Sequence, residues 1–179
     1  GRDEHKLLFS GDIKYEKSWL FDAATVRFNK VDTLVIESTY GGPQSIQPTR
    51  HQATQDLQDL IIDTLSRKGK IFCPVFAVGR SQEVMMAIDE LFKSGKVSPV
   101  TVWLDGMISE ATAIHTSHPN YLNKDLRGKM LRGGTENPFN SKWFRQVESR
   151  DQRESILLDP SPCIVLATSG MMTGGPIVE

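Results

Sequence analysis

Two acidic residues directly follow short apolar stretches, where a parallel α/β sheet would place ligands or catalytic groups. Asp12 follows the stretch at residues 7–9 and a Ser-Gly pair, and Glu37 follows the β-branched stretch at 33–36. A carboxylate in such a place is carried by a rigid strand, and Gly11 leaves room for an ion to approach. Each acid is also compatible with a structural role in a turn. The residues alone make Asp12 a candidate metal ligand and Glu37 a candidate catalytic group, with the turn role open for both.

Two loops carry groups that could bind a phosphate. The loop at residues 77–81 joins an expected strand to an expected helix and contains Gly79 and Arg80. Free backbone N–H groups, a flexible glycine and an arginine can together cradle an anion, although a tight turn with a surface arginine is equally compatible. The segment Thr168-Ser169-Gly170 repeats the arrangement after another strand. Both loops are expected at the same carboxyl edge of one sheet. Two such loops together favour a binding role more strongly than either loop does alone.

A pair of histidines is the other feature that could bind a metal. His115 and His118 are spaced i, i+3 near the end of an expected helix. No acidic third ligand lies near them at a typical spacing, so we expect solvated histidines at a helix end.

The elements that would position these residues alternate between short strands and longer amphipathic helices. Helix starts are marked by Thr49 with Gln52, by Ser81, and by Ser149 with Gln152. Strand-like runs lie at residues 33–37, 70–75, 99–104 and 163–168. Short connections between such elements favour right-handed crossovers. The chain is therefore predicted to be α/β, with a Rossmann-like parallel sheet that has helices on both faces, and an irregular region between the helix at 107–116 and Ser149.

The first third of the chain stands apart from this alternation. Its apolar runs at 7–9 and 33–37 are joined by residues with no clear crossover helix, and at most one turn is expected near residues 19–21. We expect this segment to belong to a different structural unit.

Composition narrows the class of protein. The 179 residues are 39% hydrophobic and 24% charged, which excludes collagen-like, disordered and low-complexity chains. No apolar run approaches the ~18 residues of a membrane span, so no membrane partner is expected. The net charge of -1 neither supports nor excludes RNA, because basic residues can be confined to one groove. Cys73 and Cys163 lie in apolar runs and are expected to be reduced thiols of a cytoplasmic protein.

Five ordered motifs resemble one family, the metallo-β-lactamase/β-CASP ribonucleases, and most closely the archaeal homologues of the cleavage and polyadenylation specificity factor nuclease. The motifs are Phe9-Ser10-Gly11-Asp12, residues 36–41 (IESTYG), residues 74–83 (PVFAVGRSQE), residues 104–107 (LDGM) and residues 167–171 (ATSGM). The resemblance implies two zinc ions in a cleft between a metallo-β-lactamase domain and an inserted β-CASP cassette, where a metal-bound hydroxide cleaves RNA. It also implies that residues 1–39 are a remnant of the lactamase domain and residues 40–179 are the β-CASP domain.

The resemblance also implies roles for individual residues. Asp12 matches the carboxylate that bridges both metals, and Glu37 matches the acid that orients a catalytic histidine. Arg80 and the loop Thr168-Ser169-Gly170 are expected to meet RNA phosphates. The family's His-x-His-x-Asp-His cluster and its later histidines are not in the sequence. Two zinc ions are therefore expected in the full-length parent, and none is expected to bind to this chain.

The function implied for the parent is a zinc-dependent endoribonuclease acting on single-stranded RNA in mRNA 3′-end processing or transcription termination. This chain alone is expected to be inactive. The alternative is a non-catalytic RNA-binding or scaffolding subunit of a 3′-processing complex, although Asp12 and Glu37 favour an active parent. In the family, the apolar strands of the N-terminal segment would pack inside the lactamase domain, and in this chain they would lack that packing. Residues 1–37 are therefore expected either to associate with a second copy or to fold back onto the cassette.

Overall fold

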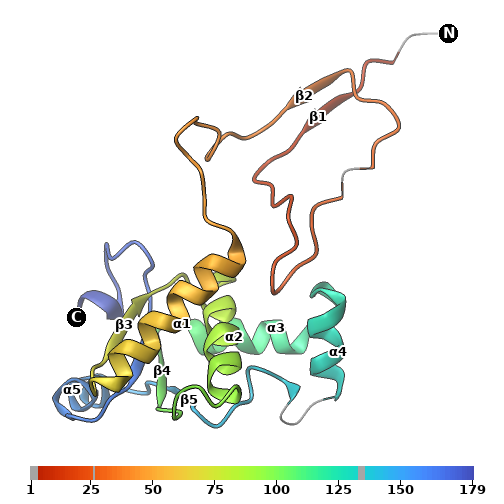
Figure 1. The fold of residues 1–179 in the computed structure, drawn as a ribbon. Helices are drawn as coiled ribbons and strands as arrows, with labels where there is room; N and C mark the ends of the chain where they lie inside the picture. Colours follow the sequence, from red (N-terminus) through yellow and green to blue (C-terminus); the bar gives the residue numbers. More distant parts are fainter. Residues whose placement is uncertain (1–3, 26, 133–135) are drawn as a thin grey trace.

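A computed structural model describes residues 4–25, 27–132 and 136–179, which form two parallel sheets (Figure 1). The larger sheet has four strands in the order β3-β6-β4-β5, and the smaller one pairs β1 with β2. The elements in chain order are β1 (Leu7–Phe9), β2 (Thr33–Val35), α1 (Arg50–Ser66), β3 (Ile71–Pro74), α2 (Arg80–Lys93), β4 (Val102–Asp105), α3 (Ile108–Ser117), η1 (Pro119–Tyr121), α4 (Lys124–Arg132), β5 (Phe144–Gln146), α5 (Arg150–Leu158), β6 (Ile164–Ala167) and η3 (Pro176–Val178).

Both faces of the larger sheet are covered, as the alternation along β6 shows. Ile164 and Leu166 point into the main core with residues of α1 and α2, whereas Val165 and Ala167 pack with Ile156 of α5 on the other face. Every strand pair of this sheet is parallel, so the connections run as crossovers over the faces. The predicted α/β class with helices on both faces is confirmed.

Two helix starts follow the predicted capping chemistry. The Oγ1 atom of Thr49 accepts a hydrogen bond of 3.2 Å from the backbone N–H of Gln52 at the start of α1. At the start of α5, the Oγ atom of Ser149 accepts one of 3.2 Å from the N–H of Gln152. Each cap satisfies a backbone donor that the first turn leaves without a partner.

The start of α2 differs from its prediction. Gly79, not Ser81, is the N-cap, and it has a φ of +81° that favours glycine. The N–H of Gly79 donates to Oε1 of Gln82, and the buried Ser81 hydroxyl donates back to the carbonyl of Ala77. The cap predicted at Ser81 is wrong because the left-handed glycine lets the helix begin two residues earlier.

Regular structure also forms in the region that the sequence marks as irregular. Helix α4 is capped by Asn123, whose Oδ1 accepts from the N–H of Leu126 at 2.9 Å, and Leu126 is buried in the main core. Strand β5 is three residues long and pairs with β4 at the edge of the sheet. Both elements depend on tertiary contacts, because neither is long enough to leave a clear periodic pattern.

The smaller sheet stands apart from the larger one, but the segment that connects β1 to β2 reaches the rest of the chain (Figure 1). The described residues of this connection, 10–25 and 27–32, leave β1, reach the main core and return to β2 without forming a helix. Leu20 of this connection is 1% exposed and belongs to the main core. The N-terminal segment thus folds back onto the rest of the chain through this connection, whereas association with a second copy and the domain boundary after residue 39 stay predictions.

No helix in the described part of the chain is long and apolar enough to cross a membrane.

The two cysteines belong to neighbouring segments of the larger sheet, with Cys73 in β3 and Cys163 directly before β6. Cys73 and Cys163 are free thiols, one half-buried and one buried. Burial raises the pKa of both thiols. Neither is therefore an activated nucleophile.

Candidate functional site

The smaller sheet brings Asp12 and Glu37 to one end. In the parallel register of β1 and β2, Phe9 lies beside Val35, so both acids follow the carboxyl ends of neighbouring strands. Ser10 joins the two chains: its N–H donates to the carbonyl of Val35 at 2.9 Å, and its Oγ accepts from the N–H of Glu37 at 3.1 Å. Two acids that are far apart in sequence thus share one sheet edge.

The two carboxylates have different surroundings. Asp12 is exposed, after the turn at Gly11 with its φ of +56°. Glu37 is half-buried, and its Oε2 accepts a hydrogen bond of 2.7 Å from the N–H of Thr39. This backbone hydrogen bond from Thr39 lowers the pKa of Glu37, so the residue is a carboxylate at neutral pH. Asp12 is therefore available to a ligand, whereas Glu37 holds its own turn with one oxygen.

These residues do not make a metal centre by themselves. Within the described ranges, no group of three or more His, Cys, Asp or Glu side chains could hold a metal ion. The Nδ1 atom of His115 donates to the carbonyl of Ala111 at 2.7 Å. The ring of His118 packs against that of Tyr121, with the ring centroids 6.4 Å apart. A catalytic zinc needs three protein ligands held together, so Asp12 can contribute only one ligand to such a site.

At the carboxyl edge of the larger sheet, the predicted 168–170 loop touches residues 75–76, which lead into the predicted loop at 77–81. Ser169 and Gly170 follow β6, and the loop before Arg80 follows β3, its parallel neighbour. A Cβ added at Gly170 would lie 3.0 Å from the backbone nitrogen of Phe76, so the close approach of the loops requires glycine. The Oγ of Ser169 is buried, and no described residue forms a hydrogen bond with it. Such an unsatisfied polar atom is uncommon in folded proteins.

The side chain of Arg80 interacts elsewhere. Its Nη1 donates to Oε2 of Glu83 at 2.8 Å, and the other oxygen of Glu83 accepts from Nη1 of Arg50 at 3.2 Å. The backbone of the 75–76 segment, and not the Arg80 guanidinium, contacts Gly170. The structure thus places the 168–170 loop against the segment that leads into the 77–81 loop, but it pairs the Arg80 guanidinium with Glu83, whose other oxygen binds Arg50.

A buried ion pair beside these loops has no signal in the sequence. Asp105 ends β4, and both of its oxygens are bonded by Arg153 of α5, from Nε at 2.6 Å and from Nη2 at 3.0 Å. The hydrogen bond with Asp105 raises the pKa of Arg153, which also pairs with Glu179. Asp105 is the last residue of β4, but its partner is 48 residues away. Spacing alone could not have found it.

The backbone around this ion pair is equally constrained. The N–H of Thr168 donates to the carbonyl of Asp105 at 3.3 Å. Gly106 has a φ of +84°, and a Cβ there would lie 2.1 Å from the Thr168 Oγ1. The Asp105–Arg153 pair therefore braces the start of the 168–170 loop.

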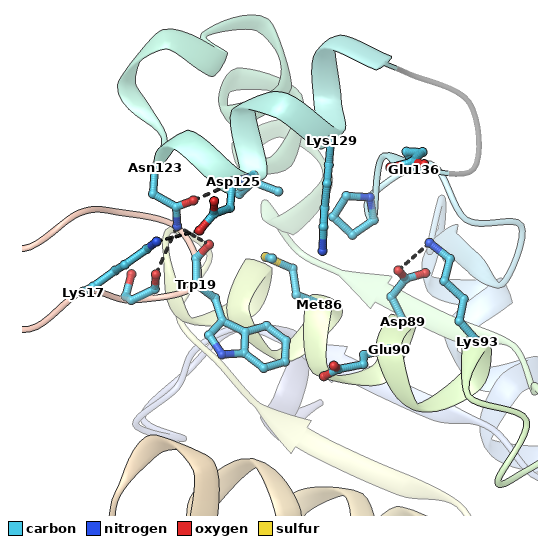
Figure 2. A pocket seen from close by; sticks show the side chains of 13 residues that line it. Lys17, Trp19, Met86, Asp89, Glu90, Lys93, Asn123, Asp125, Lys129 and Glu136 are labelled. Carbon is cyan, nitrogen blue, oxygen red and sulfur yellow. Dashed lines mark hydrogen bonds and ion pairs between the residues drawn. The ribbon is translucent and has the colours of Figure 1, made fainter.

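Residues 17–21, which we call the strap, attach the smaller sheet to the cassette (Figure 2). The Nδ2 of Asn123 donates to the carbonyls of Ser18 at 3.1 Å and Trp19 at 2.8 Å, and its N–H donates to the carbonyl of Leu20 at 2.8 Å. Lys17 pairs with Asp125 at 2.6 Å. A cavity of about 720 Å³ lies between the strap, α2 and α4. The strap thus links Asp12, five residues before Lys17, to the cassette.

Comparison with known proteins supplies the family context of this arrangement. Residues 81–179 match the family model described as the Beta-Casp domain. Over 179 residues, the chain is 49% identical to the transcription termination factor FttA of Cenarchaeum symbiosum (strain A) and 48% identical to that of Methanothermobacter thermautotrophicus. It is 44% identical to that of Thermococcus kodakarensis. These matches cover all of this chain but only 28%, 28% and 27% of the relatives, so the chain spans little more than a quarter of their length.

Proposed function

Because this chain belongs to the Beta-Casp domain family, we propose that it is the β-CASP part of a zinc-dependent endoribonuclease. The relatives that match it over its whole length are named transcription termination factors, which favours single-stranded RNA emerging during transcription as the substrate. Of the two processes expected for the longer protein, these names favour transcription termination over mRNA 3′-end processing. We place the activity in the cytoplasm, where two free thiols stay reduced.

The observation that carries this proposal is the shared sheet edge of Asp12 and Glu37. Parallel α/β proteins bind ligands outside the carboxyl ends of their strands, and both acids stand at such ends. In the proposed enzyme, Asp12 supplies a carboxylate ligand from a position open to solvent, and Glu37 orients a neighbouring group through its remaining carboxylate oxygen. The described residues gather no group of three side chains that could hold a metal ion. Cleavage is accordingly proposed for the longer protein, and this chain alone is proposed to be inactive and free of stoichiometric zinc.

The RNA contacts proposed for the cassette lie at the edge of the larger sheet. The loop of Thr168, Ser169 and Gly170 offers hydroxyls and backbone beside the loop of Arg80. Small residues allow a phosphate to approach the backbone of this loop closely. The support is the contact of Gly170 with residues 75–76, which lead into the loop of Arg80, and the buried Ser169 Oγ without a partner among the described residues.

The proposal is tested by Asp12→Ala in the longer protein. RNA cleavage should fall by orders of magnitude, because a metal ligand is lost, while binding of uncleaved RNA should persist. Asp22→Ala is the matched control, since Asp22 is another exposed acid of the same connection, and it should retain full activity. Undiminished cleavage by the Asp12 variant would refute the role of this edge. RNA binding without cleavage by the unaltered longer protein would instead favour the non-catalytic scaffolding subunit.

A further inference from the structure

Two arginines from different helices share one carboxylate. Arg50 and Arg80 are the first residues of α1 and α2, and each donates from Nη1 to a different oxygen of Glu83. The Glu83 side chain is 12% exposed, whereas those of Arg50 and Arg80 are 31% and 60% exposed. The acid therefore lies behind the two guanidinium groups, which face outward.

The charge of this cluster is incomplete. One carboxylate neutralises one of the two guanidinium groups, which leaves a net charge of about +1 at the Arg50–Glu83–Arg80 group. Each guanidinium has five N–H donors in a rigid fork, and the bond to Glu83 uses only one of the nitrogens. A group with one net positive charge and several oriented donors matches a phosphodiester, which has one negative charge and two free oxygens.

The arginines open into a cavity that can hold more than a phosphate. It has a volume of about 400 Å³ and is also lined by Lys14, Glu16 and Tyr40. The charges of Lys14 and Glu16 balance, so the net positive charge remains that of the arginine pair. Tyr40 is 69% exposed and presents an aromatic ring on which an unpaired base can stack.

The chain connects this cavity to the acidic edge. Tyr40 is three residues after Glu37, on the segment that leads from β2 to Arg50 (Figure 1). Lys14 is two residues after Asp12. Both segments that leave the Asp12–Glu37 edge therefore contribute to the wall of the cavity.

We propose that Arg50 and Arg80 bind one phosphodiester of single-stranded RNA, with the adjoining base stacked on Tyr40. This site rests on the proposed function, since it would hold the RNA strand beside the edge of Asp12 and Glu37. Glu83 is a positioning residue that keeps the two guanidinium forks side by side. The site is separate from the 168–170 loop, and the two together would hold successive parts of the strand.

The test measures binding of a fluorescein-labelled oligouridylate by fluorescence anisotropy across a salt series. The full-length protein carries Asp12→Ala so that the RNA stays intact. Arg50→Ala should weaken binding several-fold and make the slope of log K against log salt shallower by about 0.7, the value for one phosphate contact on a single strand. Arg50→Lys keeps the charge but loses the fork, so it should weaken binding with an unchanged slope.

Arg67→Ala is the matched control, because Arg67 directly follows α1 at its far end and is also paired, with Asp63 at 2.6 Å. It should change neither affinity nor slope. Tyr40→Leu should weaken binding without changing the slope, and Tyr40→Phe should restore it. Equal affinities and slopes for the Arg50→Ala and Arg67→Ala variants, both folded by thermal melting, would overturn the site. An Arg50 effect on RNA binding, together with no RNA cleavage by the full-length protein that retains Asp12, would overturn the nuclease proposal alone.

Discussion

Arg153→Met removes the guanidinium that bonds both oxygens of Asp105. The side chains of Asp105 and Arg153 are 4% and 21% exposed, so the variant leaves a buried carboxylate without its cation. Breaking a buried ion pair in this way costs about 3–5 kcal/mol. Because water can enter through the exposed fifth of Arg153, we expect the lower limit, about 3 kcal/mol of unfolding free energy.

That loss is large enough to measure by two methods. For a domain of this size, about 3 kcal/mol lowers the melting temperature by about 6–12 °C. Urea denaturation should show a lower midpoint with an unchanged m-value, because the same surface is exposed on unfolding. Combining Asp105→Asn with Arg153→Met should recover much of the loss, since no buried charge remains.

The control is a second arginine of the same helix. Arg150 pairs with Glu154 at 3.6 Å, and these side chains are 81% and 64% exposed. Such a surface pair contributes at most about 1 kcal/mol, so Arg150→Met should be nearly neutral. If the Arg153 and Arg150 variants melt within a degree of each other, the ion pair at the end of β4 does not stabilise the fold as argued.

Two further predictions concern the N-terminal segment. Asn123→Asp keeps the acceptor that caps α4 but turns a carboxylate towards the strap carbonyls, so amide hydrogen exchange should accelerate in residues 18–21. Asn137 is equally buried, and Asn137→Asp should leave that exchange unchanged. Equal exchange rates in both variants would show that Asn123 does not hold the strap in place. The hydrogen bond from the Thr39 N–H lowers the pKa of Glu37. The folding stability that this bond contributes is therefore present above the ordinary glutamate pKa and is lost as the pH falls through the lowered value. The Thr39 amide NMR shift should follow that titration, and a midpoint at or above the ordinary value would contradict it.

Local chemistry in the sequence was sufficient to predict the α/β class and several of its details. Thr49 and Ser149 cap helices because a hydroxyl oxygen satisfies a backbone donor three residues on, an interaction confined to one turn. Strands β3, β4 and β6 of the larger sheet are visible in the sequence because strands of a parallel sheet consist of continuous apolar runs. The strand-end positions of Asp12 and Glu37 follow from the same pattern.

The contacts between distant segments depend on the tertiary structure. Leu20 lies in an unpatterned connection, yet it is buried in the core of the cassette because the strap is bonded to Asn123, more than a hundred residues later. The start of α2 at Arg80 depends on the left-handed Gly79, and the side chain of Arg80 is directed by Glu83 towards Arg50 of another helix.

The physical reason lies in the range of each interaction. Caps, periodicity and strand ends are fixed within a few residues, so the sequence alone determines them. The partner of a buried charge such as Asp105 is chosen by desolvation, which forces the carboxylate to pair with whichever cation the packed helices bring within reach. Arg153 becomes that partner only after β4 and α5 have packed on the same sheet.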